Sequence, residues 1–99
     1  MKVGGLCRSK KIASLAEAAG IPCEVGSMVE MGPGTAAGLH FALSTPAVKY
    51  ACEMIGHEMI DGDIIEEEDW IATCKNGFLG LPTKPGLGFT LNKKFEYVD

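Results

Sequence analysis

The alternation of helices and short strands along the first 56 residues limits the possible fold more than any other feature of this sequence. Apolar side chains recur at helical spacing from Ile12 to Ala19, which predicts a helix over residues 7–19. Gly20 supplies a common stop after such a helix, and residues 21–25 then form a short strand candidate. The first predicted unit is thus a helix followed by a strand.

The same pair of elements is predicted a second time. A helix is expected from Gly34 or Thr35 to about Ser44. Pro46 ends it, because the residue before a proline is disfavoured in the helical conformation. Residues 49–55 form the next strand candidate. Because parallel strands are normally flanked by other strands and covered by helices, this helix-strand-helix-strand order predicts part of a larger α/β fold.

The character of the chain changes after residue 56. Residues 61–69 are rich in Asp and Glu, and this acidic cluster is interpreted as a solvated face. Asn76 and Gly77 lie between two apolar runs, residues 70–73 and 78–81, and predict a type I′ β-hairpin. Residues 89–91 could add one last short strand.

Composition excludes several classes of partner. The net charge is −4 without a basic patch, so no nucleic-acid partner is expected. No apolar run is long enough to span a membrane and no signal peptide is recognisable, so a cytoplasmic location is expected. The four cysteines lack metal-binding spacing and are interpreted as small buried apolar side chains.

Several segments of the chain resemble the muconate cycloisomerases of the enolase superfamily. Residues 11–22 (KIASLAEAAGIP) are similar to the sixth barrel helix of that family, and residues 81–88 (LPTKPGLG) look like its C-terminal segment. The matching segments appear in family order, at residues 4–6, 11–22, 26–30, 34–40, 52–56 and 81–88. Their order and spacing make the resemblance far more specific than any single motif.

The resemblance implies the C-terminal portion of a modified (β/α)7β TIM-type barrel. Residues 1–56 would form the last βα units, and residues 57–99 would be a C-terminal hairpin segment of the capping domain. Family members bind Mg2+ or Mn2+ through carboxylates on the third to fifth strands, and lysines on the second and sixth strands move a proton of a small carboxylate substrate. Those strands have no counterpart here, and Lys2 matches the basic residue that follows the catalytic lysine. The chain is therefore expected to contain no metal ligand, to need the missing N-terminal barrel half, and to be inactive alone.

Four residues match positions near the active site of the family. Glu53 falls at the end of the eighth strand, where an acidic side chain is interpreted as catalytic because barrel enzymes build their sites at strand ends. Ser27, Met28 and Glu30 follow the seventh strand, close to where relatives contact substrate, although a structural role for Glu30 is equally compatible with the sequence. Cycloisomerase, dipeptide epimerase and succinylbenzoate synthase chemistry all stay open.

Two other functions fit some of the same residues. Gly32, Gly34 and Ala37 match the G-x-G-x-x-A fingerprint of a dinucleotide-binding module, with Glu53 at nearly the right distance for a ribose contact. Pro33 is awkward in such a turn. The third alternative is a non-catalytic fragment that associates with itself to cover its strand edges and apolar helix faces.

Overall fold

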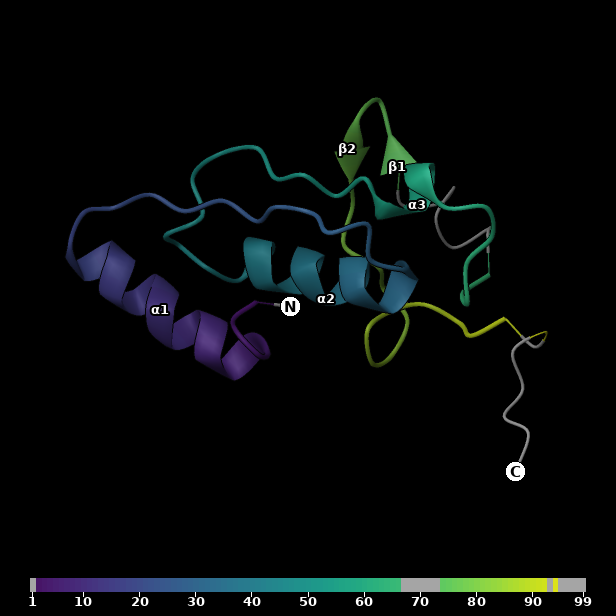
Figure 1. Ribbon diagram of the computed structural model, residues 1–99, viewed down its shortest axis with the longest axis horizontal. Coiled ribbons are helices and arrows are strands. Elements are labelled where there is room, and N and C mark those ends of the chain that lie inside the picture. Colours follow the sequence, from purple (N-terminus) through teal and green to yellow (C-terminus); the bar gives the residue numbers. More distant parts are fainter. Residues whose placement is uncertain (1, 67–73, 93, 95–99) are drawn as a thin grey trace.

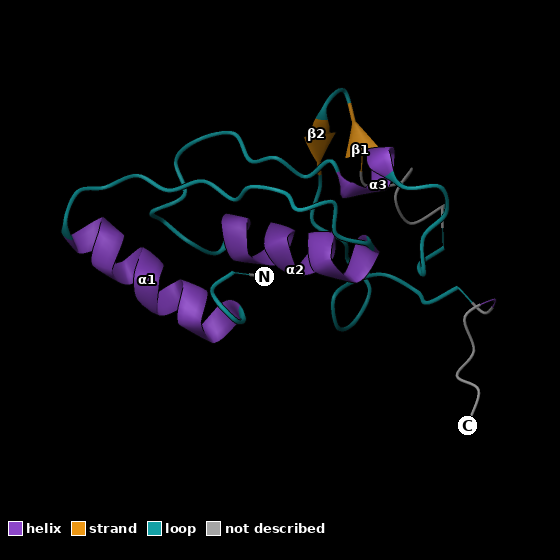
Figure 2. Cartoon of the chain, in the orientation of Figure 1, coloured by secondary structure: helices purple, strands orange, loops and turns teal. Residues whose placement is uncertain are grey.

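The computed structural model describes residues 2–66, 74–92 and 94, and places two long helices beside extended segments (Figure 1). The elements in chain order are α1 (Leu6–Ala18), α2 (Gly32–Leu43), α3 (Gly56–Met59), β1 (Cys74–Lys75) and β2 (Phe78–Leu79). The long connections before α2 and after it run along one side of the two helices (Figure 2). Within the described ranges, no helix has the length and apolar character needed to cross a membrane.

Helix α1 confirms the prediction to within one residue at each end. Its C-terminus is closed by a Schellman arrangement: the Ile21 N–H donates to the Ala16 carbonyl at 2.8 Å, and the Gly20 N–H donates to the Glu17 carbonyl at 3.0 Å. Gly20 adopts a φ of 70°, which glycine adopts without steric cost.

Helix α2 begins about two residues earlier than predicted. Pro33 lies in its first turn, where a missing N–H is tolerated, and the carboxylate of Asp63 accepts the N–H of Gly32 at 2.7 and 3.0 Å. The Asp63 side chain is half-buried, and its carboxylate is bound to α2. The interpretation of residues 61–69 as a solvated face is therefore wrong for Asp63. Residues 67–69 lie outside the described part of the chain.

The predicted strands at residues 21–25 and 49–55 are extended but form only one parallel bridge, between Cys23 and Val48. The Lys49 N–H donates to the Cys23 carbonyl at 3.1 Å. The Val25 carbonyl then accepts the N–H of Glu53 at 2.9 Å, whereas a regular parallel ladder would use the N–H of Ala51. The prediction of two regular strands is thus wrong in detail, because a parallel pair without neighbouring strands has little to hold its register.

The hairpin prediction is confirmed. Strands β1 and β2 pair antiparallel, and Asn76 and Gly77 adopt φ values of 53° and 77°, as a type I′ turn requires. Residues 70–73, predicted as part of one flanking strand, lie outside the described residues. Helix α3 was not predicted. Leu91 forms an isolated antiparallel bridge with Ile65 instead of a further strand.

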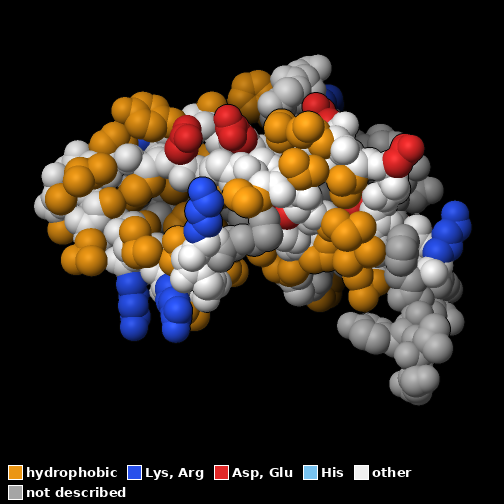
Figure 3. Space-filling model, in the orientation of Figure 1, with side chains coloured by type: hydrophobic (Ala, Val, Ile, Leu, Met, Phe, Trp, Pro, Cys, Tyr) orange, Lys and Arg blue, Asp and Glu red, His pale blue; other side chains and the backbone are white. Residues whose placement is uncertain are grey.

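The described core is small, and much apolar surface is left uncovered. The buried apolar side chains are those of Ala13, Ala36, Leu39, Ala47, Met54 and Ile65. By contrast, Leu15 on α1 is 72% exposed and Leu43 at the end of α2 is 61% exposed. Figure 3 shows hydrophobic side chains over a large part of the visible face. The expectation of buried cysteines is wrong for Cys7, which lies exposed on α1, while Cys23 and Cys52 are half-buried free thiols.

Candidate functional site

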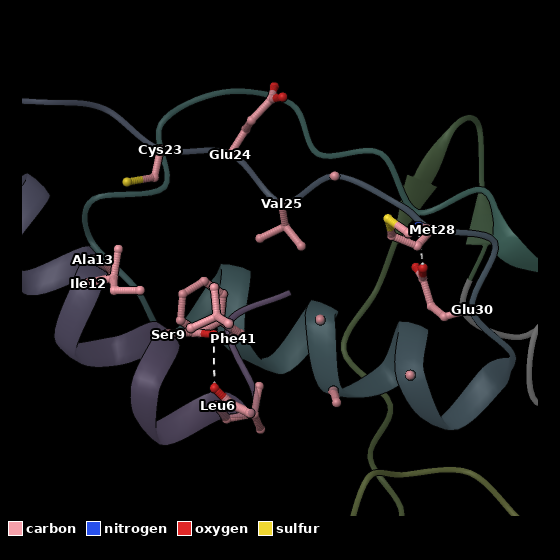
Figure 4. Close-up of a pocket in the computed structure, with 16 residues that line it drawn as sticks. Leu6, Ser9, Ile12, Ala13, Cys23, Glu24, Val25, Met28, Glu30 and Phe41 are labelled. Atoms are coloured by element: carbon pink, nitrogen blue, oxygen red, sulfur yellow. Dashed lines mark hydrogen bonds between the residues drawn. The ribbon is translucent and has the colours of Figure 1, made fainter. Parts of the chain in front are cut away.

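The loop between the first extended segment and α2 is closed by a ring of hydrogen bonds around Glu30. The Ser27 hydroxyl donates to the Glu30 carboxylate, with both oxygens at 3.2 Å. The Met28 N–H donates to Oε2 of Glu30 at 2.7 Å, the bond drawn between these two residues in Figure 4. The Ser27 hydroxyl oxygen also accepts the N–H of Val29 at 3.1 Å. We call this arrangement of residues 27–30 the Glu30 clasp. It brings together three of the predicted site residues.

Two glycines from other elements make room for the Glu30 clasp. A Cβ atom on Gly34, in the first turn of α2, would lie 2.8 Å from the Cβ of Glu30. A Cβ atom on Gly56, at the start of α3, would lie only 2.0 Å from the Glu30 carbonyl oxygen. The fully buried Thr35 also donates its hydroxyl to that carbonyl, at 3.4 Å. The backbone of Glu30 is therefore enclosed by α2 and α3.

Glu53 lies beside the start of the same loop. Its N–H pairs with the Val25 carbonyl, and a Cβ atom on Gly26 would lie 3.8 Å from its carboxylate oxygen Oε2. The Glu53 side chain is exposed. The structure therefore brings all four predicted residues to one place, where the two extended segments end.

A cavity of about 420 Å³ lies between the two long helices and the first extended segment. In Figure 4, Val25 points from the extended segment towards Phe41 on α2, whereas Glu24 points away from the helices. The lining is mostly apolar and comes chiefly from α1, α2 and the extended segment, with Leu6, Ile12, Ala13, Val25, Met28 and Phe41 among its members.

Known proteins are similar to this chain in sequence. The sequence profile of the family described as "Enolase C-terminal domain-like" matches residues 1–95. The chain belongs to this family. Muconate cycloisomerase 1 of Rhodococcus opacus is 36% identical over 91 residues, which are 92% of this chain and 24% of that protein.

Solved structures of enolase-superfamily enzymes agree with this membership. Muconate lactonizing enzyme from Klebsiella pneumoniae matches with a TM-score of 0.80 and 35% identity, over 94% of this chain and 25% of that chain. N-succinyl Arg/Lys racemase from Bacillus cereus matches with a TM-score of 0.78 and 36% identity, over 92% and 23%. The α/β class predicted from the sequence is thus supported, and the chain spans about a quarter of the length of these enolase-family relatives.

The dinucleotide-binding alternative does not fit this enolase-family geometry. Phosphate binding at a helix N-terminus needs free backbone N–H groups. At the start of α2 the N–H of Gly32 is bound to the Asp63 carboxylate, Pro33 has none, and the N–H of Gly34 donates to the Met31 carbonyl at 2.9 Å. A carboxylate already occupies the position that an anionic phosphate would need, and none of the relatives named above is a nucleotide-binding module by its name.

The residues described here do not fit the divalent metal that the enolase family implies. No group of three or more His, Cys, Asp or Glu side chains gathers within residues 2–66, 74–92 and 94 in a way that could hold a metal ion. Both oxygens of Glu30 are engaged by the clasp. No metal-dependent step can therefore be assigned to these side chains.

Sequence reasoning missed the residues that support the site. Asp63 acts through a distant hydrogen bond and Gly56 through packing, and neither carries a motif of its own. Gly34 also acts through packing, but the sequence matched it only to the dinucleotide fingerprint. The clasp did carry a signal, because Ser27-Met28-Val29-Glu30 has the S-x-x-E pattern of a capping box, in which serine and glutamate bind backbone N–H groups near each other. Here the same pattern closes a loop instead of a helix.

Proposed function

We propose that this chain supplies the last part of a muconate-cycloisomerase-like barrel, with residues 1–56 as the final βα units and residues 57–99 as a segment of the capping domain. The observation that carries the proposal is the position of Glu53, whose exposed carboxylate lies beside the loop after the preceding extended segment. In a barrel enzyme, such strand ends line the active site.

The partner in this proposal is the upstream part of the barrel. Cys23 and Val25 pair with the second extended segment, and among the described residues Glu24 and Gly26 make no backbone hydrogen bond. In a parallel pair, alternate residues face opposite neighbours, so this second edge is available to another strand. The apolar cavity next to it would be filled by the same upstream segment.

The substrate in this proposal is a small carboxylate, and the reaction passes through an enolate. The upstream part would supply the catalytic lysines and the Mg2+ or Mn2+ ligands, since no group of the described side chains could hold a metal ion. Glu53 would act on a neighbouring lysine, because a carboxylate at close range favours the charged form of an amine. The chain alone would therefore be inactive.

A reconstitution experiment tests the proposal. The chain is coexpressed with the upstream region of a muconate cycloisomerase, and the purified complex is assayed for magnesium-dependent exchange of the substrate α-proton in D2O. We expect a complex with activity, a large loss of kcat in Glu53→Gln, and no change in the matched control Glu17→Gln on the exposed surface of α1. Unchanged kinetics in Glu53→Gln would remove this residue from the site.

The chain alone provides the second test. Light scattering on a sizing column should show that the isolated chain is not a compact oligomer, and the activity assay should show no turnover. A single compact oligomer would instead favour self-association through the exposed apolar side chains of α1 and α2. Robust magnesium-dependent isomerisation by the pure chain would overturn the need for an upstream partner.

A further inference from the structure

We infer that Glu30 is a positioning residue, which fixes the loop of residues 27–30 and, through Gly56, the end of the segment that carries Glu53. In this interpretation neither Ser27 nor Glu30 binds substrate with its side chain. Met28, whose side chain is 56% exposed, is the group that the loop presents. The inference rests on the proposed function, because the site that it organises is the one proposed above.

The hydrogen bonds of the Glu30 clasp carry the first step. The single proton of the Ser27 hydroxyl is shared between the two carboxylate oxygens of Glu30, at 3.2 Å from each, and Oε2 also accepts the Met28 N–H at 2.7 Å. The Ser27 hydroxyl both donates to Glu30 and accepts from Val29. A substrate carboxylate would be repelled by Glu30 and would find the Ser27 proton engaged. These groups are therefore arranged to hold the loop.

The backbone of Val29 carries the second step. Its φ of 58° lies in the left-handed region, which is unfavourable for a β-branched residue. Such a conformation persists only where the surroundings impose it, and these positions concentrate at functional sites. The N–H of Val29 is held by the Ser27 hydroxyl, which is itself held by Glu30. The clasp is thus the device that stabilises this strained turn.

Packing around the main chain of Glu30 carries the third step. Its carbonyl oxygen fills the space that a side chain on Gly56 would occupy, and Gly56 is three residues after Glu53. The side-chain stem of Glu30 lies against Gly34 in the same way. A displacement of Glu30 towards α3 would therefore push on the start of that helix, three residues after Glu53.

Amide hydrogen exchange tests the clasp without any assay of activity. The exchange rate of the Met28 amide is measured by NMR and compared with that of the amide of Leu39, a buried residue of α2. The sample is the free chain or its complex with the upstream region, whichever protects the Leu39 amide. Glu30→Ala should accelerate Met28 exchange roughly tenfold relative to Leu39, because the acceptor of that N–H is lost. The matched control Glu17→Ala should leave the ratio unchanged. A Met28 amide in the unmodified chain that exchanges as fast as an unfolded peptide, while Leu39 is protected, would overturn the inference.

Kinetics in the reconstituted enzyme then separate positioning from direct contact. Glu30→Gln keeps the side-chain length and one acceptor oxygen, so a positioning role predicts that it retains most of kcat/KM while Glu30→Ala loses it. A direct electrostatic role predicts that both variants lose activity equally, which would contradict the inference. A Ser27→Ala, Glu30→Ala double variant should be little worse than either single variant, because both belong to one unit. Absence of activity in the unmodified complex would contradict the proposed function, whereas the amide exchange result would still decide the role of Glu30.

Discussion

The close approach of Gly56 to Glu30 makes a sharp prediction about stability. The Cβ atom of a Gly56→Ala variant would lie 2.0 Å from the Glu30 carbonyl oxygen, a backbone atom that is itself enclosed by α2. Ordinary contact needs more than about 3 Å, so α3 or the loop must move by roughly 1 Å or more. Gly56 does not adopt a positive φ, so alanine suits the local backbone and the effect is steric alone.

The expected cost follows from this geometry. Overpacking of a fixed site typically costs about 1–3 kcal/mol, and a backbone neighbour places Gly56→Ala near the upper end of that range. Gly38→Ala, in the interior of α2, provides the matched control. Its new Cβ would lie 3.5 Å from the side chain of Met54, which is an ordinary contact distance. Alanine there should stabilise the chain by about 0.5–1 kcal/mol through its helix propensity.

Urea denaturation followed by far-UV circular dichroism measures both changes. The two alanine variants should shift the midpoint in opposite directions, Gly56→Ala downwards and Gly38→Ala upwards. In the reconstituted enzyme, Gly56→Ala should also lower kcat/KM, since Glu53 lies three residues earlier. A Gly56→Ala variant as stable as the unmodified chain would refute the close packing between α3 and the Glu30 loop.

Two further predictions concern contacts between distant parts of the chain. Lys10 on α1 donates to the Ser44 carbonyl, to the Ser44 hydroxyl at 2.9 Å and to the Thr45 hydroxyl at 2.7 Å. Lys10 joins the two helices through charge-assisted hydrogen bonds at the C-terminus of α2, so Lys10→Met should lower the free energy of unfolding by about 1–2 kcal/mol in urea titrations at low salt. The control Lys11→Met, at the exposed neighbouring residue, should change it little. Equal effects of the two substitutions would contradict the contact. In the same titrations, Asp63→Ala should lower the free energy of unfolding by about 1–2 kcal/mol, because it removes the cap of α2, and Asp63→Asn should lower it less. An Asp63→Ala variant as stable as the unmodified chain would show that the cap contributes nothing.

Local features of this fold could be predicted from the sequence because their causes are local. The stop of α1 depends on Gly20 and the residues next to it, and the type I′ turn depends only on Asn76 and Gly77. The start of α2 could not be placed, because its first N–H is bound by Asp63, 31 residues further along the chain. No periodicity or turn motif reports such a partner.

The candidate site shows the same division. The resemblance to muconate cycloisomerases selected Glu53 and the 27–30 loop together, and the structure places them together. It could not separate a residue that contacts substrate from one that supports the loop, since both occupy matched positions. That distinction depends on where the Glu30 carboxylate points and on what lies against Gly56, and both follow from the tertiary structure.

The distant cap of α2 also has a consequence for the order of events during synthesis. A protein leaves the ribosome N-terminus first, and folding proceeds in that direction as residues emerge. Residues 6–43 could form both long helices early, yet the first N–H of α2 lacks its partner until Asp63 has been added. The start of α2, next to the Glu30 loop, thus lacks its cap until translation has added Asp63. A ribosome that pauses before Asp63 has been added would hold a chain in which the start of α2, next to the Glu30 loop, is still uncapped.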